Sequence, residues 1–422
     1  MHRAICKEQR GIELCKLLLI GSRAKNKCIA AVYLRPHASN PRGALWLTGN
    51  DLYLTLKSAM PYRETAILIK FGQIGDVIMA VPAARALYER GFDITWCCGS
   101  AVKPLLECYS WIDVIGVDDR AILTGSWVHR AQGVTRFWSK VAFRKYDLCA
   151  TLYYDRRFHL LTFPIRARRK LSLSRQSRSR EYLPGRNHID EILRVVLASE
   201  DSCREESVAP VRPDRLPPSP LLPKSERRRI ALVPGGAANM VRRQILRRWP
   251  VENYVELARQ FLDRGWEIVL LGGPEDGWVK PYFEEIRHTD CIGALSLPEV
   301  ISACDTCDAV ISHDTGPMHL AGLSQACLIG LFGPTDPAMF LPRRPFSVGL
   351  WGGQGFACRP CYDGTNFAPC QFNGCMRQVT PLMVLRELDR LLEARSRGLA
   401  SSWRIVVPDQ NRLNTVNGVK NQ

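Results

Sequence analysis

The sequence predicts an α/β protein with two doubly wound parallel-sheet domains that face each other across a cleft. Two observations support this fold class. Short apolar runs alternate with amphipathic stretches along most of the chain, which is typical of parallel sheets covered by helices. Residues 209–224 contain six prolines, so they suit neither a helix interior nor a central strand. They are expected to form the linker between the two halves.

The first half, residues 61–208, shows the strand and helix pattern clearly. Its expected strands lie within residues 65–71, 93–99 and 145–155, and its expected helix within residues 77–91. A glycine-containing turn separates the first strand from the helix. Gly91 stands at the predicted helix end, where glycine readily adopts the left-handed conformation that ends a helix.

The second half, residues 225–398, repeats this pattern. Strands with following turns are expected within residues 228–236, 267–273, 308–314 and 327–336, and helices within residues 250–266, 297–305 and 316–326. Residues 1–60 do not fit the pattern, and we expect a disordered extension or a segment that is not native. Residues 399–422 are expected to be a peripheral tail.

Composition points to a soluble, cytoplasmic protein. Hydrophobic residues make up 46% and charged residues 23% of the chain, as in ordinary globular proteins. No apolar stretch reaches the length of a membrane span, and no signal peptide is evident. Most of the 16 cysteines are scattered singly, which favours reduced thiols over a disulfide framework.

Four cysteines near the C-terminus are the exception to this scatter. Cys358, Cys361, Cys370 and Cys375 form the spacing C-x2-C-x8-C-x4-C. The first pair has the spacing of metal ligands, but the whole cluster is too short for a standard zinc ribbon. A structural zinc ion, disulfides and free thiols all remain open for this cluster, and a catalytic role is not expected.

The net charge of +17 is concentrated in three segments. Residues 1–59, 163–186 and 224–248 each carry a net +7, so the rest of the chain sums to −4. Such patches suit phosphates, anionic lipid surfaces or nucleic acids, although each can also be plain solvated surface. Because no nucleic-acid-binding module is recognisable, nucleic acid is not an expected partner.

The tripeptide Asp314-Thr315-Gly316 allows two interpretations. It carries the catalytic carboxylate of aspartic proteases, but those enzymes need two facing carboxylates, and a second Asp-Thr-Gly is absent from the sequence. The alternative is an anion-binding turn between a strand and a helix. Gly316 permits close backbone approach, and Pro317 suits the first helical turn. The α/β setting favours the anion-binding turn.

Three segments together resemble glycosyltransferase family 9, the ADP-heptose:lipopolysaccharide heptosyltransferases. They are "ILIKFGQIGDVIMAVPAARALYER", "RRWPVENYVELARQFLDRGWEIVLLGGPED" and "DAVISHDTGPMHLAGLSQACLIGLFGPTDP", and the resemblance extends over residues 64 to about 395. It implies the GT-B architecture, which consists of two Rossmann-like domains. It further implies transfer of heptose from ADP-heptose to a lipopolysaccharide inner-core or related acceptor, with inversion. No acidic metal-binding pair of the Asp-x-Asp kind stands out at the donor site, so we expect a reaction without a metal or other cofactor.

The resemblance makes Asp76 the candidate general base. It matches the aspartate of the family's Gly-Asp-hydrophobic turn after the first strand. The reaction needs a group that removes the proton of the acceptor hydroxyl, and a carboxylate can do this. Asp76 could equally serve as a helix N-cap, and the two roles are compatible.

The resemblance places donor binding in the second half. The residues concerned are Asp314, Thr315, Gly316, His319, Arg247 and Glu275. Arg247 stands where the family commonly has a lysine; arginine can bind a diphosphate through two nitrogens, but it is not equivalent to lysine. Either Arg247 or Arg248 could face the diphosphate. Glu275 could accept ribose hydroxyls or be a solvated loop carboxylate, and His319 could be a buried helix histidine.

The resemblance assigns the acceptor, an acidic lipid-linked oligosaccharide, to the first half. The candidate residues are Arg166, Arg168, Arg169 and Lys170. They could bind acceptor phosphates or the anionic inner leaflet, which implies peripheral membrane contact. Otherwise they belong to a solvated Arg/Ser-rich loop. Two rival functions remain: a related enzyme with another nucleotide sugar or acceptor, and a non-catalytic sugar-nucleotide-binding protein.

Overall fold

The computed structural model describes residues 63–408 with internal gaps. The gaps are residues 124–125, 154–155, 174–186, 198–207, 238–243 and 363–366. The chain divides at Arg63, and Glu64 begins one compact unit that includes every element described below. The prediction for residues 1–60 therefore lies outside the described residues.

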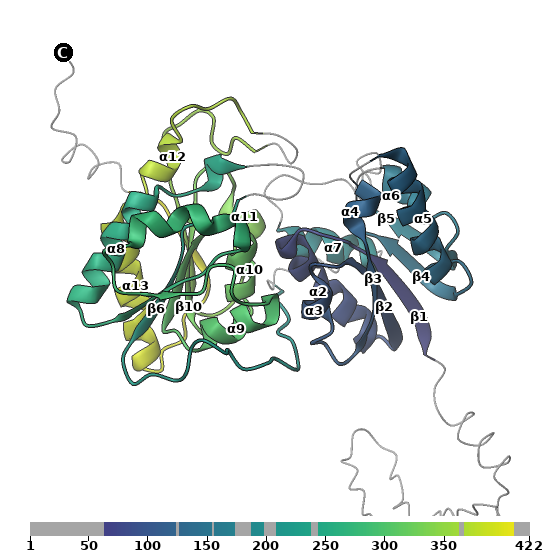
Figure 1. Cartoon of the computed structure of the whole chain (residues 1–422), viewed down its shortest axis with the longest axis horizontal. Coiled ribbons are helices and arrows are strands. Elements are labelled where there is room, and N and C mark those ends of the chain that lie inside the picture. The colour runs from purple at the N-terminus through teal and green to yellow at the C-terminus, as the bar shows by residue number, and fades with distance from the viewer. Residues whose placement is uncertain are drawn as a thin grey trace, which may run out of the picture. The chain divides into compact units, whose positions relative to one another are not determined.

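The first half contains a parallel sheet of five strands in the order β3-β2-β1-β4-β5 (Figure 1). The strands are β1 (Glu64–Ile69), β2 (Phe92–Gly99), β3 (Ile112–Val117), β4 (Lys145–Thr151) and β5 (Arg166–Ser172). The helices are α2 (Ile74–Glu89), α3 (Lys103–Leu106), α4 (Asp119–Leu123), α5 (Trp127–Val141), α6 (Arg156–Leu161) and α7 (His188–Leu197). The central strand β1 is buried over its last four residues because helices cover both faces of the sheet.

The second half contains a parallel sheet of seven strands in the order β12-β11-β10-β9-β6-β7-β8. The strands are β6 (Arg229–Val233), β7 (Glu267–Leu270), β8 (Thr289–Asp290), β9 (Ala309–His313), β10 (Cys327–Phe332), β11 (Ser347–Trp351) and β12 (Arg404–Val406). The helices are η3 (Ile245–Arg247), α8 (Val251–Asp263), η4 (Pro274–Phe283), α9 (Leu297–Asp305), α10 (Gly316–Ala321), α11 (Pro337–Phe340), α12 (Gly374–Arg377) and α13 (Pro381–Ser396).

The fold confirms the predicted class of two parallel-sheet α/β halves. Strands β6, β9 and β10 are buried along their whole length, as expected for apolar runs at the centre of a parallel sheet. The described residues of the proline-rich stretch 209–224 contain neither helix nor strand. In the described part of the chain, no helix is long and apolar enough to cross a membrane.

The two halves pack directly against each other. Ile78 of α2 belongs to the same buried cluster as Val233 and Met318 of the second half. Across the same boundary, the Asn187 side-chain amide donates to the carbonyl of Ala338 over 3.0 Å. These contacts bring the start of α2 close to α10, which is where the predicted site residues lie.

The start of α2 differs from the sequence prediction. The helix begins at Ile74 rather than near residue 77, and its N-cap is Gln73, with φ of 64°. Asp76 therefore lies inside the first helical turn and is not the N-cap. At the other end Gly91 has φ of 92°, which confirms the predicted glycine stop.

Two further segments differ from expectation. Residues 166–172 form strand β5, so the four basic candidates lie on a strand and not in an Arg/Ser-rich loop. Residues 404–406 form β12, which pairs in parallel with β11, so the supposed peripheral tail contributes the last strand of the second sheet. β5 is rich in basic residues, and such a sequence can still form a strand where one side of the strand has a pairing partner.

Candidate functional site

Asp76 forms an ion pair with Lys70 at the carboxyl end of β1. The two charged atoms are 3.0 Å apart, and the side chain of Asp76 is 29% exposed whereas that of Lys70 is 5% exposed. The Lys70 ammonium group also donates to the carbonyl of Leu152 and lies 4.5 Å from the centre of the Tyr153 ring. Lys70 is thus held in place from three sides, and Asp76 keeps an accessible face.

This pairing controls the charge of Asp76. Burial is the largest single influence and would raise the pKa of this carboxyl, but the charge and hydrogen bond of Lys70, together with the nearby His188 and His319, hold the pKa below its ordinary value. Asp76 is therefore ionised at neutral pH. The reciprocal effect raises the pKa of Lys70 despite its burial, so the lysine stays charged.

Two buried histidines lie near this ion pair. Burial lowers the pKa of His188 to about 4 and also lowers the pKa of His319, so both imidazoles are neutral at pH 7. Both ring nitrogens of His188 are buried without a hydrogen-bond partner among the described residues. Asp76 therefore has one charged neighbour, the Lys70 ammonium group, and two neutral neighbours, the imidazoles of His188 and His319.

His319 connects the two halves at the site. A Cβ atom added to Gly75 would lie only 2.6 Å from the His319 ring, so glycine is required for α2 to approach α10. Asp76 and Asp314 both act electrostatically on this imidazole. His319 therefore lies between the candidate base of the first half and the Asp-Thr-Gly turn of the second.

Asp314 is buried and receives two hydrogen bonds on one carboxylate oxygen. Arg247 donates over 3.1 Å and the Thr335 hydroxyl donates over 2.8 Å. The Arg247 side chain remains 22% exposed, and its Nε atom has no partner among the described residues. Arg247 can thus present part of its guanidinium group to a ligand while Asp314 fixes its position.

A second pair of turns meets beside Thr315. The backbone amide of Ala237 donates to the Thr315 hydroxyl over 3.0 Å. Asp276 accepts from the amides of Gly236 and Gly273 over 2.6 and 2.8 Å. One buried carboxylate therefore joins the glycine turns after β6 and β7, so that both turns border the start of α10.

These residues lie where α/β proteins of this kind bind ligands. Asp314 follows β9, Thr335 follows β10 and the glycine turns follow β6 and β7, so all four groups stand at the carboxyl edge of one parallel sheet. Asp76 stands at the same edge of the other sheet.

Comparison with known proteins agrees with this geometry. Residues 201–370 match the model of glycosyltransferase family 9 (heptosyltransferase). This segment of the chain is therefore similar to glycosyltransferase family 9.

A curated relative of this chain is lipooligosaccharide heptosyltransferase 2 of Haemophilus influenzae. It is 33% identical over 101 residues, which are 22% of this chain and 28% of the relative. The chain thus matches less than a third of that relative's length, so its activity and substrates are treated below as proposals.

Solved structures show the same fold. The Escherichia coli ADP-heptose lipopolysaccharide heptosyltransferase II is 18% identical, with a TM-score of 0.61 over 79% of this chain and 99% of that chain. The iron-containing dodecameric glycosyltransferase TibC of enterotoxigenic Escherichia coli is 13% identical, with a TM-score of 0.50 over 80% of this chain and 78% of that chain. The architecture of the chain is GT-B.

The structure brings most of the predicted donor residues together. Asp314, Thr315, Gly316, His319 and Arg247 surround the start of α10. Arg248 turns elsewhere, because its Nε donates to the carbonyl of Gly236 and its guanidinium lies over the ring of Trp278. Glu275 is exposed in the first turn of η4, and its role in ribose binding stays a prediction.

The predicted acceptor residues lie apart from Asp76. They occupy β5, two strands away from β1. Arg166 is six residues before the strand end at Ser172, which corresponds to roughly 20 Å along the sheet. Lys170 donates to the carbonyls of Thr162 and Phe163. Arg166 therefore lies far from the strand ends at which Asp76 stands, and the role of the four side chains in acceptor binding stays a prediction.

The cysteine cluster contains free thiols. Cys358, Cys361, Cys370 and Cys375 are all unpaired by disulfides in the structure, and they interact electrostatically with one another. Among the residues that the structure describes, no three His, Cys, Asp or Glu side chains are grouped to hold a metal ion.

Sequence reasoning missed four residues of the site. They are Lys70, His188, Asp276 and Thr335. Three of them follow a strand closely, and a charged or hydroxyl residue at the carboxyl end of a parallel strand is a usable signal. His188 gave no such signal, because its position near Asp76 depends on how α7 packs against α2.

Proposed function

We propose that this chain is an inverting heptosyltransferase that transfers heptose from ADP-heptose to a lipopolysaccharide inner-core or related acceptor. One observation carries the proposal: His319 lies between Asp76 and Asp314. The candidate base and the candidate donor turn, which are far apart in the sequence, thus border one buried imidazole. The match of residues 201–370 to the heptosyltransferase family model supports the same reaction class.

In the proposed reaction Asp76 removes the proton of the acceptor hydroxyl. The acceptor oxygen then forms a bond to the anomeric carbon, and the bond from that carbon to the β-phosphate oxygen breaks. The electron pair leaves with ADP, and attack from the opposite face inverts the anomeric centre. An ionised, partly exposed carboxylate that is fixed by Lys70 suits this task.

Positive groups of the protein would hold the leaving diphosphate. Arg247 is oriented by Asp314 and keeps an exposed surface. The backbone amides at Thr315 and Gly316 would add hydrogen bonds at the start of α10. Positioned guanidinium and amide groups can stabilise developing negative charge, and we therefore propose a reaction that does not require a metal ion.

The proposed acceptor is acidic and attached to a membrane lipid. The exposed basic side chains of β5 are accompanied by exposed apolar side chains at the same edge of the sheet. Phe143 precedes β4 and is 90% exposed, and Phe163 precedes β5 and is 79% exposed. Basic and aromatic groups together suit peripheral contact with an anionic leaflet, which would be the cytoplasmic face of the inner membrane.

Calorimetry tests the donor assignment. ADP, UDP, GDP and dTDP are titrated in EDTA into the wild type, into Asp314→Ala and into a control, Asp389→Ala, whose carboxylate is exposed in the same half. We expect selective ADP binding that is lost only in Asp314→Ala. Selectivity for another nucleotide would contradict the proposed sugar donor, and a requirement for metal would contradict metal independence.

A further inference from the structure

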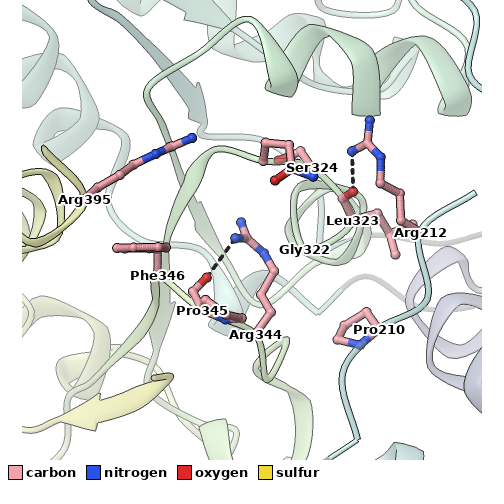
Figure 2. Close-up of a pocket in the computed structure, with 10 residues that line it drawn as sticks. Pro210, Arg212, Gly322, Leu323, Ser324, Arg344, Pro345, Phe346 and Arg395 are labelled. Carbon is pink, nitrogen blue, oxygen red and sulfur yellow. Dashed lines mark hydrogen bonds between the residues drawn. The ribbon is translucent and has the colours of Figure 1, made fainter. Parts of the chain in front are cut away.

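The second half contains a hollow lined by three arginines at the edge of the sheet opposite the site described above. Its lining includes Arg212, Arg344 and Arg395 (Figure 2), and its volume is about 290 Å³. The neighbouring wall residues Ser324 and Phe346 precede β10 and β11. β10 spans six residues, so the length of a strand, roughly 20 Å, separates this hollow from the donor turn.

The arginines come from three different parts of the chain. Arg212 belongs to the proline-rich linker, Arg344 to the loop before β11, and Arg395 to the last turn of α13. In Figure 2, Arg212 and Arg395 enter from opposite sides, and Arg344 lies between them. Three segments thus place like charges around one small space.

Only one of these arginines pairs with a carboxylate among the described residues. Arg212 binds both oxygens of Asp305, over 3.1 and 2.6 Å. Arg344 donates instead to backbone carbonyls, including that of Pro345 over 3.0 Å. A sulfur atom, Sγ of Cys327, accepts from Arg395 at 3.9 Å. The positive charge around the hollow therefore exceeds the negative charge.

Burial and a neighbouring positive charge both disfavour the charged form of Arg344. Burial lowers its pKa to about 10, and the nearby charge of Arg395 acts in the same direction. Its Nε atom is buried and lacks a hydrogen-bond partner among the described residues. Arg344 is partly buried and makes no ion pair among the described residues, so an anion in the hollow would add a favourable charge interaction.

We propose that this hollow is a binding site for the phosphate group of a small soluble ligand. Guanidinium groups bind phosphate oxygens through paired hydrogen bonds, and a volume of about 290 Å³ lies at the small end of ligand pockets. The hollow thus suits inorganic phosphate or a small phosphomonoester. Because Arg212 belongs to the linker, a bound phosphate would add to the contacts that Arg212 already makes with Asp305 and Leu323 of the second half.

Calorimetry with inorganic phosphate at constant ionic strength tests the site. We expect one saturable phosphate in the wild type, with the dissociation constant weakened about tenfold or more in Arg395→Gln and in Arg344→Gln. The matched control is Arg397→Gln, which removes an exposed arginine of the same helix end that pairs with Glu393. It should stay within about twofold of the wild type.

Two further measurements distinguish this site from the donor turn and from a site for membrane lipids. Arg247→Gln alters the donor turn and should leave this phosphate constant unchanged; a loss there would place the phosphate at the donor turn and overturn the proposal. Arg395→Gln and the wild type should bind phosphatidylglycerol vesicles equally. Weaker vesicle binding by Arg395→Gln would overturn the assignment to a soluble ligand.

Misfolding of Arg344→Gln alone cannot account for the expected loss of phosphate affinity in both variants. Arg344 contacts several backbone carbonyls, so its variant could unfold, but Arg395 is exposed and its substitution leaves those bonds intact. The absence of saturable binding in the wild type, or wild-type affinity in Arg395→Gln, would overturn the proposal.

Discussion

Replacing Asp76 by asparagine tests the proposed general base with little change of shape. The amide oxygen of the new side chain can still accept from the Lys70 ammonium group, which also keeps its bond to Leu152. What disappears is the negative charge and the ability to take a proton. A positioned general base contributes roughly 10²–10⁴-fold to the rate, so kcat should fall by that factor, which corresponds to about 3–5 kcal/mol.

The effect of this substitution on stability should be smaller. Breaking a buried ion pair by removing a partner costs about 3–5 kcal/mol. Here Asp76 is 29% exposed and the hydrogen bond survives, so we expect a loss of about 1–2 kcal/mol in the free energy of unfolding. The protein should therefore remain folded at assay temperature.

The assay measures ADP release at saturating donor and acceptor, together with calorimetric binding of ADP. Donor affinity should stay within about threefold of the wild type, because Asp76 does not belong to the donor turn. The control is Asp113→Asn, an exposed carboxylate of the same half. A kcat within tenfold of the wild type would refute the role of Asp76. ADP binding without turnover by the wild type on any acceptor would favour a binding protein.

Three other changes probe the surroundings of the site. Lys70→Met removes the charge that holds the pKa of Asp76 low, so the acid limb of the pH–rate profile should move to higher pH; a profile that superposes on the wild type contradicts this pairing. Gly75→Ala places a Cβ 2.6 Å from the His319 ring. It should lower the free energy of unfolding by about 1–3 kcal/mol, which a lower Tm would show. An unchanged or higher Tm would mean that the two halves do not pack there as described. Asp276→Ala removes two hydrogen bonds to backbone amides and should destabilise the fold by about 2–4 kcal/mol while weakening donor binding, as urea unfolding and calorimetry can show.

The pattern of apolar runs predicted most of the fold correctly. Strands β1, β2, β6, β9 and β10 lie where their apolar stretches indicated, because a strand covered on both faces must be apolar throughout. Gly91 was predictable for a similar local reason, since its left-handed backbone conformation favours glycine.

The start of α2 shows where local reasoning fails. Gly75 has poor helix propensity, so the apolar pattern favours a helix start near residue 77, yet the helix begins at Ile74. Packing against α10 decides the matter, because only glycine allows His319 to approach so closely. Strand β5 is a related case: its basic composition is compatible with a loop, and its pairing with β4 is a tertiary fact.

The sequence by itself determined the alternation of strands and helices, the glycine turns after the strands, and the chemical identity of Asp76, Arg247 and Asp314. The strands, helices and turns depend on residues that are only a few positions apart in the sequence. Only the tertiary structure decided that Asp76 would pair with Lys70 and lie near His319. His319 is separated from Asp76 by most of the chain, and its position depends on how two complete α/β halves pack together. The charged state of the candidate base therefore depends on the position of Lys70 and of two histidines, which together offset the opposing effect of burial and which no local pattern specifies.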